Sequence, residues 1–353
     1  MYFQTKIEEL DTIEIVKSKF INWEFFKNKS FFVTGATGLI GSQVIKALLY
    51  ANEKFNLNIK IIAMVRNKSK VNKIFQDTQS IEFIYQDVLE PLKYDNSIDF
   101  IIHTANNTSS KSFVETPVET INSIVLGTNN ILTFAKNKNI KSLVYLSSME
   151  VYGNIPLNRI EPLSERDYGY LDILQTRSSY QEGKKLAECL CFAYAEEYSI
   201  PIKIARLSQT IGAGVEYTDN RVFAQFARNI VEGNDILLKT KGETIRSYCY
   251  ITDAISAIFC LLEKGGNGEC YNIANPETTC SIFDMASNLC KKYPTSKLRV
   301  NTSENDSNYY LNTLKYQLDI SKIKEKTNWE PKVSLDDAYS RLISSFNELK
   351  SKH

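Results

Sequence analysis

The stretch Ser30 to Gly41, with the sequence SFFVTGATGLIG, decides the fold of this chain. An apolar run at 31–33 leads into Gly35, Gly38 and Gly41, and the residues that follow carry apolar side chains at a helical period. The glycines let the backbone approach an anion closely, while free N–H groups and the helix dipole face it. The stretch therefore predicts a cradle for the pyrophosphate of a dinucleotide, with an ordinary strand-to-helix turn as the alternative.

The remainder of the first half alternates strand-like and helix-like segments. Apolar runs at 59–65, 81–85, 98–103 and 142–147 read as strands, and 117–135 reads as a long helix. No hairpin signal separates the runs, so the strands are expected to be parallel and joined through βαβ units. This pattern predicts an α/β fold with an open, doubly wound parallel sheet of the Rossmann type.

Composition excludes several classes of protein. The 353 residues carry a formal net charge of +1, which argues against a nucleic-acid binder or a protein held on anionic membranes. No apolar stretch approaches the roughly 20 residues of a membrane span, and charges occupy the place of a signal-peptide core, so we expect a cytoplasmic protein. Seven cysteines without a C-x-x-C pair, and only His103 and His353 as imidazoles, predict no metal site.

The end of the second predicted strand indicates which dinucleotide is bound. An acidic residue about 20 positions beyond the glycines bonds the adenosine ribose in NAD-binding folds, whereas an arginine suits the 2′-phosphate of NADP. This chain has Arg66, with Lys68 and Lys70 close behind and no acidic residue between them. The sequence favours NADP over NAD, the alternative being that these are ordinary surface cations.

Two further stretches indicate catalysis. The segment SSMEVYG, from Ser147 to Gly153, starts where a strand is expected to end, which is where open α/β sheets place ligands. Tyr180 and Lys184 form a Y-x-x-x-K pair one helical turn apart, so both side chains point the same way. An ammonium beside a phenol is expected to lower the pKa of the phenol, and the positive charge of a nicotinamide adds to this effect, so that Tyr180 exchanges a proton with a substrate hydroxyl that Ser148 also holds. A surface pair is the alternative for Y-x-x-x-K alone.

These motifs, in this order, resemble the extended short-chain dehydrogenases/reductases that modify nucleotide-activated sugars. The resemblance covers about residues 29–346. It rests on the glycine turn and SSMEVYG together with these stretches: HTANNTSS from His103, PVETINSIVLGTNNIL from Pro117, RSSYQEGKKLAE from Arg177, ARLSQTIGAG from Ala205, RSYCYITDA from Arg246, YNIAN from Tyr271, and KTNWEP from Lys326.

The resemblance implies roles for individual positions. Ser148, Glu150, Tyr180 and Lys184 would be catalytic. The cofactor would be bound by Tyr180 and Lys184 and by these residues: Gly35, Thr37, Gly38, Leu39, Ile40, Gly41, Arg66, Asp87, Val88, Thr104 and Ala105. The nucleotide-diphosphate sugar would be bound by Ser148, Met149, Glu150, Gln209, Arg221 and Arg246, with guanidinium forks on the phosphates.

Three positions depart from the family pattern. Met149 stands where sugar 4,6-dehydratases have an aspartic acid, and a thioether cannot donate a proton to a leaving hydroxyl. Gln209 replaces a customary asparagine, so the contacts to the diphosphate are expected to be rearranged. Arg66 replaces the acidic residue of the members that retain NAD, which favours a reductase that consumes NADPH.

These departures leave three hypotheses for the function. The favoured one is hydride transfer at sugar C4, by a 4-keto-sugar reductase or a C4-epimerase. The alternative is a decarboxylase of the UDP-glucuronate type, because those enzymes have a glutamate at the place of Glu150 and a similar R-S-x-Y-x-E-G-K segment. A non-catalytic NADP-binding regulator is the least supported, because Ser148, Tyr180 and Lys184 are all present.

The resemblance also implies the domain plan and assembly. Residues 1–28 would be an N-terminal helical extension, 29–206 with 248–275 the dinucleotide-binding domain, and 207–247 with 276–353 a smaller, discontinuous lobe that binds the nucleotide sugar. Apolar residues near Leu186, at 190–193, are consistent with a homodimer through this helix, or with an ordinary core face.

Overall fold

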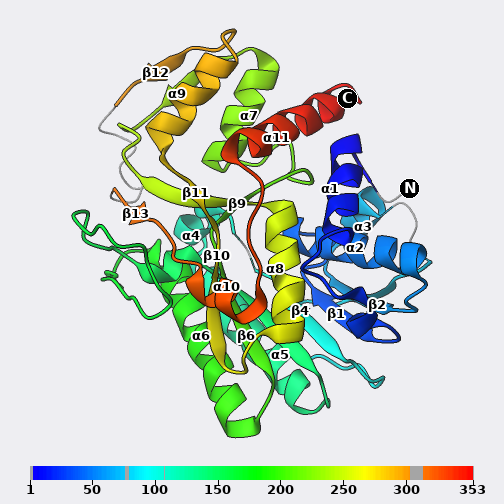
Figure 1. The fold of residues 1–353 in the computed structure, drawn as a ribbon. Helices are drawn as coiled ribbons and strands as arrows, with labels where there is room; N and C mark the ends of the chain where they lie inside the picture. The colour runs from blue at the N-terminus through cyan, green and yellow to red at the C-terminus, as the bar shows by residue number, and fades with distance from the viewer. Residues whose placement is uncertain (1–2, 76–78, 107, 303–312, 353) are drawn as a thin grey trace.

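A seven-stranded parallel sheet forms the centre of the computed structural model, which describes residues 3–75, 79–106, 108–302 and 313–352 (Figure 1). The strand order is β10-β6-β5-β4-β1-β2-β3. The bounds are β1 Ser30–Thr34, β2 Lys60–Val65, β3 Glu82–Tyr85, β4 Phe100–His103, β5 Ser142–Ser148, β6 Ile202–Leu207 and β10 Glu269–Ile273. The predicted doubly wound parallel sheet is therefore confirmed. Asn107, within a predicted motif, and 303–312, within the predicted second lobe, lie outside the described residues.

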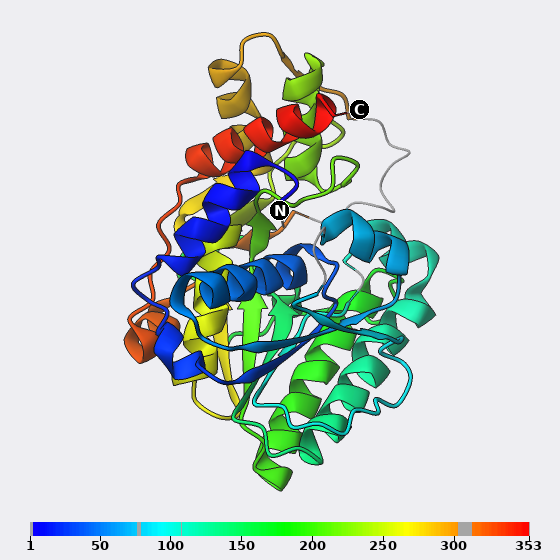
Figure 2. The same ribbon diagram turned by 90° about the vertical axis from the view of Figure 1, so that its right-hand side faces the viewer.

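Helices cover both faces of this sheet, which is why its strands are apolar on both sides. Phe31 and Val33 of β1 join a core with α2 (Leu39–Phe55) and α8 (Ile251–Lys264), whereas Phe32 points into the opposite core. That second core is closed by α5 (Pro117–Lys136) and α6 (Ser178–Tyr198). Figure 2 shows the two helical layers on either side of the strands. Two short helices, α3 (Lys68–Ile74) and α4 (Ser110–Glu115), complete this part.

The N-terminal extension is helical and packs on the main body. Helix α1 (Lys6–Val16) lies beside α2 and α8 and also contacts α11 (Leu335–Lys350), as Figure 2 shows. A 3-10 turn, η1 (Trp23–Phe26), buries Trp23 and Phe26 against Phe259 of α8. The extension thus touches segments more than 300 residues away in the chain.

A smaller group of elements lies at the carboxyl ends of the central strands (Figure 1). It contains a sheet of β9 (Ile245–Tyr250), flanked by β11 (Asn275–Ser281), β13 (Lys315–Tyr316) and β7 (Gln209–Ile211), and a second sheet of β8 (Ile236–Leu238) with β12 (Leu298–Val300). Helices α7 (Val222–Glu232), α9 (Ile282–Lys292) and α11 pack around them, while α10 (Ser321–Thr327) contacts β10 and α8.

The predicted domain boundaries stay a prediction, but one predicted boundary cuts through a strand of the structure. Residues 248–250 were assigned to the large domain, but they are the end of β9 and pair with β7 in the smaller sheet. Within the described ranges, no helix is long and apolar enough to cross a membrane. The same residues contain no group of histidine, cysteine or acidic side chains arranged to hold a metal ion.

Candidate active site

The glycine turn after β1 forms a cradle that side chains would fill. Gly35 has φ +62°, and the N–H of Gly38 donates to the Gly35 carbonyl at 2.9 Å. A Cβ on Gly41 would overlap the Gly35 oxygen and lie 3.0 Å from Cα of Ala36. Because α2 begins at Leu39, its first N–H groups, which lack intrahelical partners, belong to this turn, together with Thr37 and Ile40. The arrangement fits the pyrophosphate of a dinucleotide.

The other predicted cofactor residues lie at the carboxyl ends of neighbouring strands. A Cβ on Gly35 would be 2.6 Å from Oγ1 of Thr104 and 2.8 Å from Ala105, so the loop after β4 lies directly against the turn. Val88 is buried against Gly127 of α5. The structure thus brings the glycine turn and the loop after β4 together between β1 and β4, at the reversal of strand order where α/β folds bind dinucleotides.

Arg66 follows β2 directly and is exposed. Its side chain is 73% exposed, and Nη1 lies 3.3 Å from Oδ2 of Asp87, the predicted adenine contact. This pair is mostly in water, so it holds the guanidinium only weakly. Arg66 therefore has its charge available at the edge of the predicted adenosine site.

Tyr180 lies inside the site rather than on the surface. It is 6% exposed, and its ring stacks on Phe113 at 4.2 Å between centroids. Burial raises the pKa of the Tyr180 phenol above its usual value, and the charge of Glu150 raises it further. A hydrogen bond with Ser148 and the charges of Arg221 and Arg177 lower the pKa of Tyr180 in part. Ser148 and Tyr180, which were predicted to hold the same sugar oxygen, therefore lie near each other.

Lys184 is not among the charges that lower the pKa of Tyr180, although the sequence predicted this effect. Nζ of Lys184 donates to the carbonyl of Leu146 at 2.6 Å and lies 5.9 Å from the centroid of the Tyr180 ring. Burial lowers the pKa of Lys184 to about 7. The sequence predicted that Lys184 lowers the pKa of Tyr180, but that pKa is raised, and the opposing positive charge comes from Arg221 and Arg177. The reason is burial, which the Y-x-x-x-K spacing does not reveal.

Glu150 is held at the start of a short turn after β5. The turn η2 (Met149–Tyr152) is capped by Ser148, whose Oγ accepts from the Glu150 N–H at 3.2 Å. Oε1 of Glu150 is 3.6 Å from Nη2 of Arg177, and the two side chains are 8% and 12% exposed. Oε2 of Glu150 is buried with no hydrogen-bond partner among the described residues. Glu150 thus has an unused acceptor in the site.

Arg177 is the residue that the sequence reasoning missed. It precedes α6 and lies over the ring of Phe113, with its carbon Cζ 5.6 Å from the ring centroid. Nε of Arg177 is buried and has no partner within the part of the chain that the structure describes. The available signal was its place three residues before Tyr180, which put it one helical turn away on the same face.

The remaining predicted substrate residues lie around the same centre. Nε of Arg246 in β9 is also buried without a partner in the described ranges. Burial and the charge of Glu150 raise the pKa of Tyr316, and the charges of Arg246 and Arg177 lower it, so all three charged groups face this tyrosine. Arg221 is already held, since its Nη2 donates to Asp219 at 2.7 Å. Gln209 is half-buried in β7, opposite Tyr248.

Met149 and His103 are buried among residues of the protein itself. Met149 is 1% exposed and packs in an apolar cluster with Tyr316 and Leu318, so it is not a proton donor. His103 is buried, with Nδ1 2.7 Å from Oγ1 of Thr34 and Nε2 3.2 Å from Oγ1 of Thr128. Burial lowers the pKa of His103 to about 3, so this imidazole is neutral near neutral pH.

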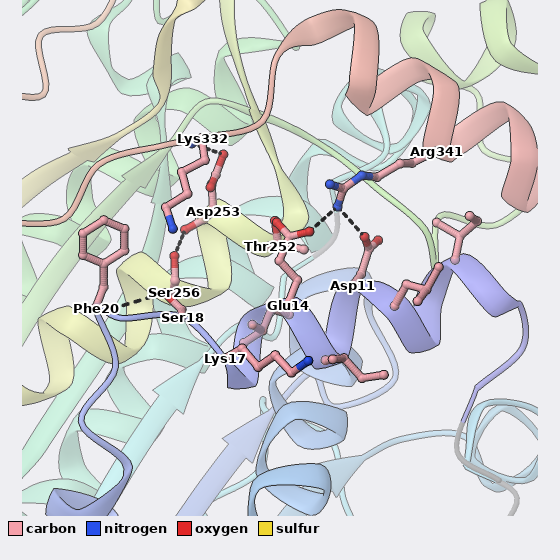
Figure 3. A pocket seen from close by; sticks show the side chains of 14 residues that line it. Asp11, Glu14, Lys17, Ser18, Phe20, Thr252, Asp253, Ser256, Lys332 and Arg341 are labelled. Atoms are coloured by element: carbon pink, nitrogen blue, oxygen red, sulfur yellow. Dashed lines mark hydrogen bonds and ion pairs between the residues drawn. The ribbon is translucent and has the colours of Figure 1, made fainter.

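A separate hollow of about 510 Å³ lies between α1, α8 and α11 (Figure 3). Its lining includes Asp11, Glu14, Asp253 and Arg341, and Figure 3 shows the arginine reaching Asp11 and Glu14 of α1. None of the predicted catalytic, cofactor or substrate residues lines it. The hollow therefore belongs to the junction between the N-terminal extension and the smaller group of elements.

The chain is similar in sequence to known proteins over nearly its whole length. The profile described as the NAD dependent epimerase/dehydratase family matches residues 31–274. "UDP-glucuronic acid decarboxylase 6" of Arabidopsis thaliana is 32% identical over 92% of this chain and 91% of that protein. "UDP-glucuronic acid decarboxylase 1" of Xenopus tropicalis is 26% identical over 91% of this chain and 72% of that protein.

Solved structures share the fold. "Epimerase Mth375" from Methanothermobacter thermautotrophicus superimposes with a TM-score of 0.78 at 20% identity, covering 94% of this chain and 95% of that one. "UDP-Glucuronic acid 4-epimerase" from Bacillus cereus, solved with UDP-glucuronic acid and NAD, has a TM-score of 0.73 at 22% identity, covering 92% and 100%.

Proposed function

The chain belongs to the NAD-dependent epimerase/dehydratase family, and from that premise we propose that it is a decarboxylase of UDP-glucuronate. The observation that carries the proposal is Glu150, a buried carboxylate with an unused acceptor beside Ser148 and Tyr180. The relatives named as UDP-glucuronic acid decarboxylases support it, since the likeness extends over 92% of the chain.

The proposed reaction passes through a keto acid. Oxidation of the C4 hydroxyl gives a ketone β to the C6 carboxylate. The C5–C6 bond then breaks and carbon dioxide leaves, while the electron pair of that bond stays on the sugar as a C4 enolate. C5 takes a proton from solvent water, and return of hydride to C4 and of a proton to its oxygen gives a UDP-pentose. A bound nicotinamide supplies the chemistry of taking and returning that hydride.

The chain's own residues hold and move the protons. Tyr180 takes the proton of the C4 hydroxyl and later returns it, and Ser148 holds the same oxygen. Lys184 and the glycine turn hold the dinucleotide, while Arg221 and Arg246 bind the diphosphate. Buried Nε of Arg246, which lacks a partner in the described ranges, suits an anionic ligand.

This proposal reverses the order that the sequence analysis favoured. A C4 reductase or epimerase came first there, on the strength of Arg66, and the curated relatives favour the decarboxylase instead. The reductase stays the second candidate because Arg66 is exposed at the predicted adenosine site and no acidic residue ends β2. For the same reason we propose NADP as the preferred dinucleotide, with NAD as the alternative.

The test is to incubate the protein with UDP-glucuronate and either NAD or NADP, and to measure carbon dioxide and nucleotide products. Release of carbon dioxide with formation of a UDP-pentose is expected. UDP-glucose, which has no carboxylate to lose, is the control substrate. If UDP-glucuronate yields no carbon dioxide with either dinucleotide, while a 4-keto nucleotide sugar is reduced at the expense of NADPH, the reductase replaces the decarboxylase.

We also propose a homodimer formed by α5 and α6. These neighbouring helices expose large apolar side chains, namely Val118, Ile121 and Leu126 of α5 and Leu186 and Phe192 of α6. Exposed apolar patches mark interaction surfaces in many proteins. Light scattering at micromolar concentration is expected to give twice the mass of one chain, and a single-chain mass would reject the dimer.

A further inference from the structure

Arg177 and Glu150 lie side by side in the site, and each has a buried hydrogen-bonding atom without a partner among the described residues. Nη2 of Arg177 is 3.6 Å from Oε1 of Glu150, an ion-pair distance that is too long for a hydrogen bond. Nε of Arg177 and Oε2 of Glu150 are buried without partners among the residues that the structure describes. Buried charged groups normally use their remaining donors and acceptors, so this pair is incomplete.

The two unused atoms have opposite character. Nε–H is a donor without acceptor capacity, and a carboxylate oxygen is an acceptor. One neighbouring group that accepts from Nε and donates to Oε2 satisfies both, and a hydroxyl or a water molecule does so. A bare carboxylate or phosphate does not, because it has no proton for Glu150 and carries the same charge.

The surroundings fix where Arg177 points. Phe113 stacks on Tyr180 at 4.2 Å and lies 5.6 Å from the guanidinium carbon of Arg177, so the three side chains form one packed group. The charge of Arg177 lowers the pKa of Tyr180, whereas Glu150 raises it. Arg177 therefore pairs with Glu150 and lowers the pKa of Tyr180, and the proposed reaction needs both of these groups.

Resting on the proposed function, we propose that Arg177 is a positioning residue. It holds the Glu150 carboxylate turned into the site, and with Glu150 it clamps one hydroxyl beside Tyr180. That hydroxyl belongs to the sugar ring or to a bound water. Arg177 itself takes no proton in this scheme, because a guanidinium does not deprotonate in proteins.

The test compares Arg177→Gln and Arg177→Lys with wild type. Gln removes the charge, while Lys keeps the charge and loses the planar fork. Without the charge of Arg177, which lowers the pKa of Tyr180, this phenol holds its proton more strongly, so R177Q is expected to move the acid limb of the kcat profile to higher pH. We expect kcat to fall about 100-fold in R177Q. R177K is expected to restore the acid limb but to keep most of the loss in kcat.

Arg159→Gln is the matched control. Arg159 pairs with Asp167 at 2.8 Å on the segment that precedes α6, so this variant also removes an arginine–carboxylate pair. It is expected to keep the wild-type pH profile. Thermal unfolding and dinucleotide binding of each variant separate a folding defect from the effect on the site.

The occupant of the clamp is identified with analogues of the nucleotide uronate that lack the C2 or the C3 hydroxyl and keep the C4 hydroxyl, which the proposed reaction oxidises. If R177K lowers kcat less on one analogue than on the parent sugar, the clamped hydroxyl is the one that this analogue lacks. If the loss is the same on every analogue, the occupant is water.

An R177Q variant that folds and keeps the wild-type acid limb overturns the proposal, as does an R177K variant whose limb matches R177Q. Failure of the proposed function is seen separately, as wild type that releases no carbon dioxide. The pH comparison is then made on the nucleotide sugar that wild type does convert.

Discussion

The hydroxyl of Tyr250 donates a hydrogen bond of 2.6 Å to Oδ2 of Asp11, across 239 positions of the chain. Both residues are buried, and Oδ1 of Asp11 accepts from Arg341 at 2.9 Å (Figure 3). Helix α1 is thereby tied to β9 and to α11. The N-terminal extension, whose role the sequence did not show, joins the helices of the central sheet to the smaller group of elements.

Asp11 gives the first prediction, on pH and stability. Burial raises the pKa of Asp11 to about 6 from 3.8, although Tyr250 and Arg341 oppose the shift. The folded state then binds this proton more tightly than the unfolded state, so the contribution to stability is present below about pH 4 and is lost as pH rises through 6. In urea unfolding, the stability of wild type relative to Asp11→Asn should fall by about 2 to 3 kcal/mol from pH 4 to pH 7. A difference that stays constant with pH would contradict it.

The buried ion pair of Lys46 and Glu8 gives the second prediction. These side chains, on α2 and α1, are 1% and 2% exposed. Lys46→Met leaves the carboxylate unpaired and should cost about 3 to 5 kcal/mol of unfolding free energy. The double variant with Glu8→Gln should cost less than the sum of the single changes, because no charge is left buried. Lys6→Met, which breaks an exposed pair on α1, is the control and should cost under about 1 kcal/mol.

Tyr180 gives the third prediction. Tyr180→Phe keeps the ring stacked on Phe113 but removes the hydroxyl that contacts Ser148. Turnover should fall about 100- to 10,000-fold, with the melting temperature and dinucleotide binding little changed. Tyr198→Phe, at the exposed end of the same helix, should keep full activity. Intact turnover in Y180F would remove the tyrosine from the proposed chemistry.

Gly41 gives the fourth prediction. In Gly41→Ala the new Cβ meets the Gly35 carbonyl, which is backbone and cannot move aside without opening the turn. Dinucleotide affinity, measured by calorimetry, should fall at least about 10-fold. Gly266→Ala is the control, because its Cβ meets only the flexible end of Glu269. Unchanged affinity in G41A would show that the cofactor does not use this turn.

Arg66 gives the fifth prediction. Arg66→Asp replaces the cation with a carboxylate that suits the ribose hydroxyls of NAD. The ratio of the NADP to the NAD dissociation constant should rise at least about 10-fold, since a 2′-phosphate would then face a negative charge. Lys73→Asp, a cation farther along α3, should leave the ratio unchanged. Equal ratios in wild type and R66D would exclude Arg66 from the adenosine site.

The sequence by itself determined the sheet, and it predicted which positions would carry the chemistry. Glycine spacing after an apolar run, and apolar segments without hairpins, depend on local backbone preferences and on burial of both sheet faces, and these can be read along the chain. Tyr180 and Lys184 could be paired because helical spacing fixes which side chains share a face.

Only the tertiary structure decided how those groups are charged and held. The pKa of Tyr180 depends on burial and on arginines from other segments, and so it rises where the sequence predicted a fall. Arg177 opposite Glu150, and α1 tied to Tyr250, are contacts between distant segments that no local pattern encodes. The physical reason is that desolvation and charge pairing depend on distance in space, which the order of residues does not give.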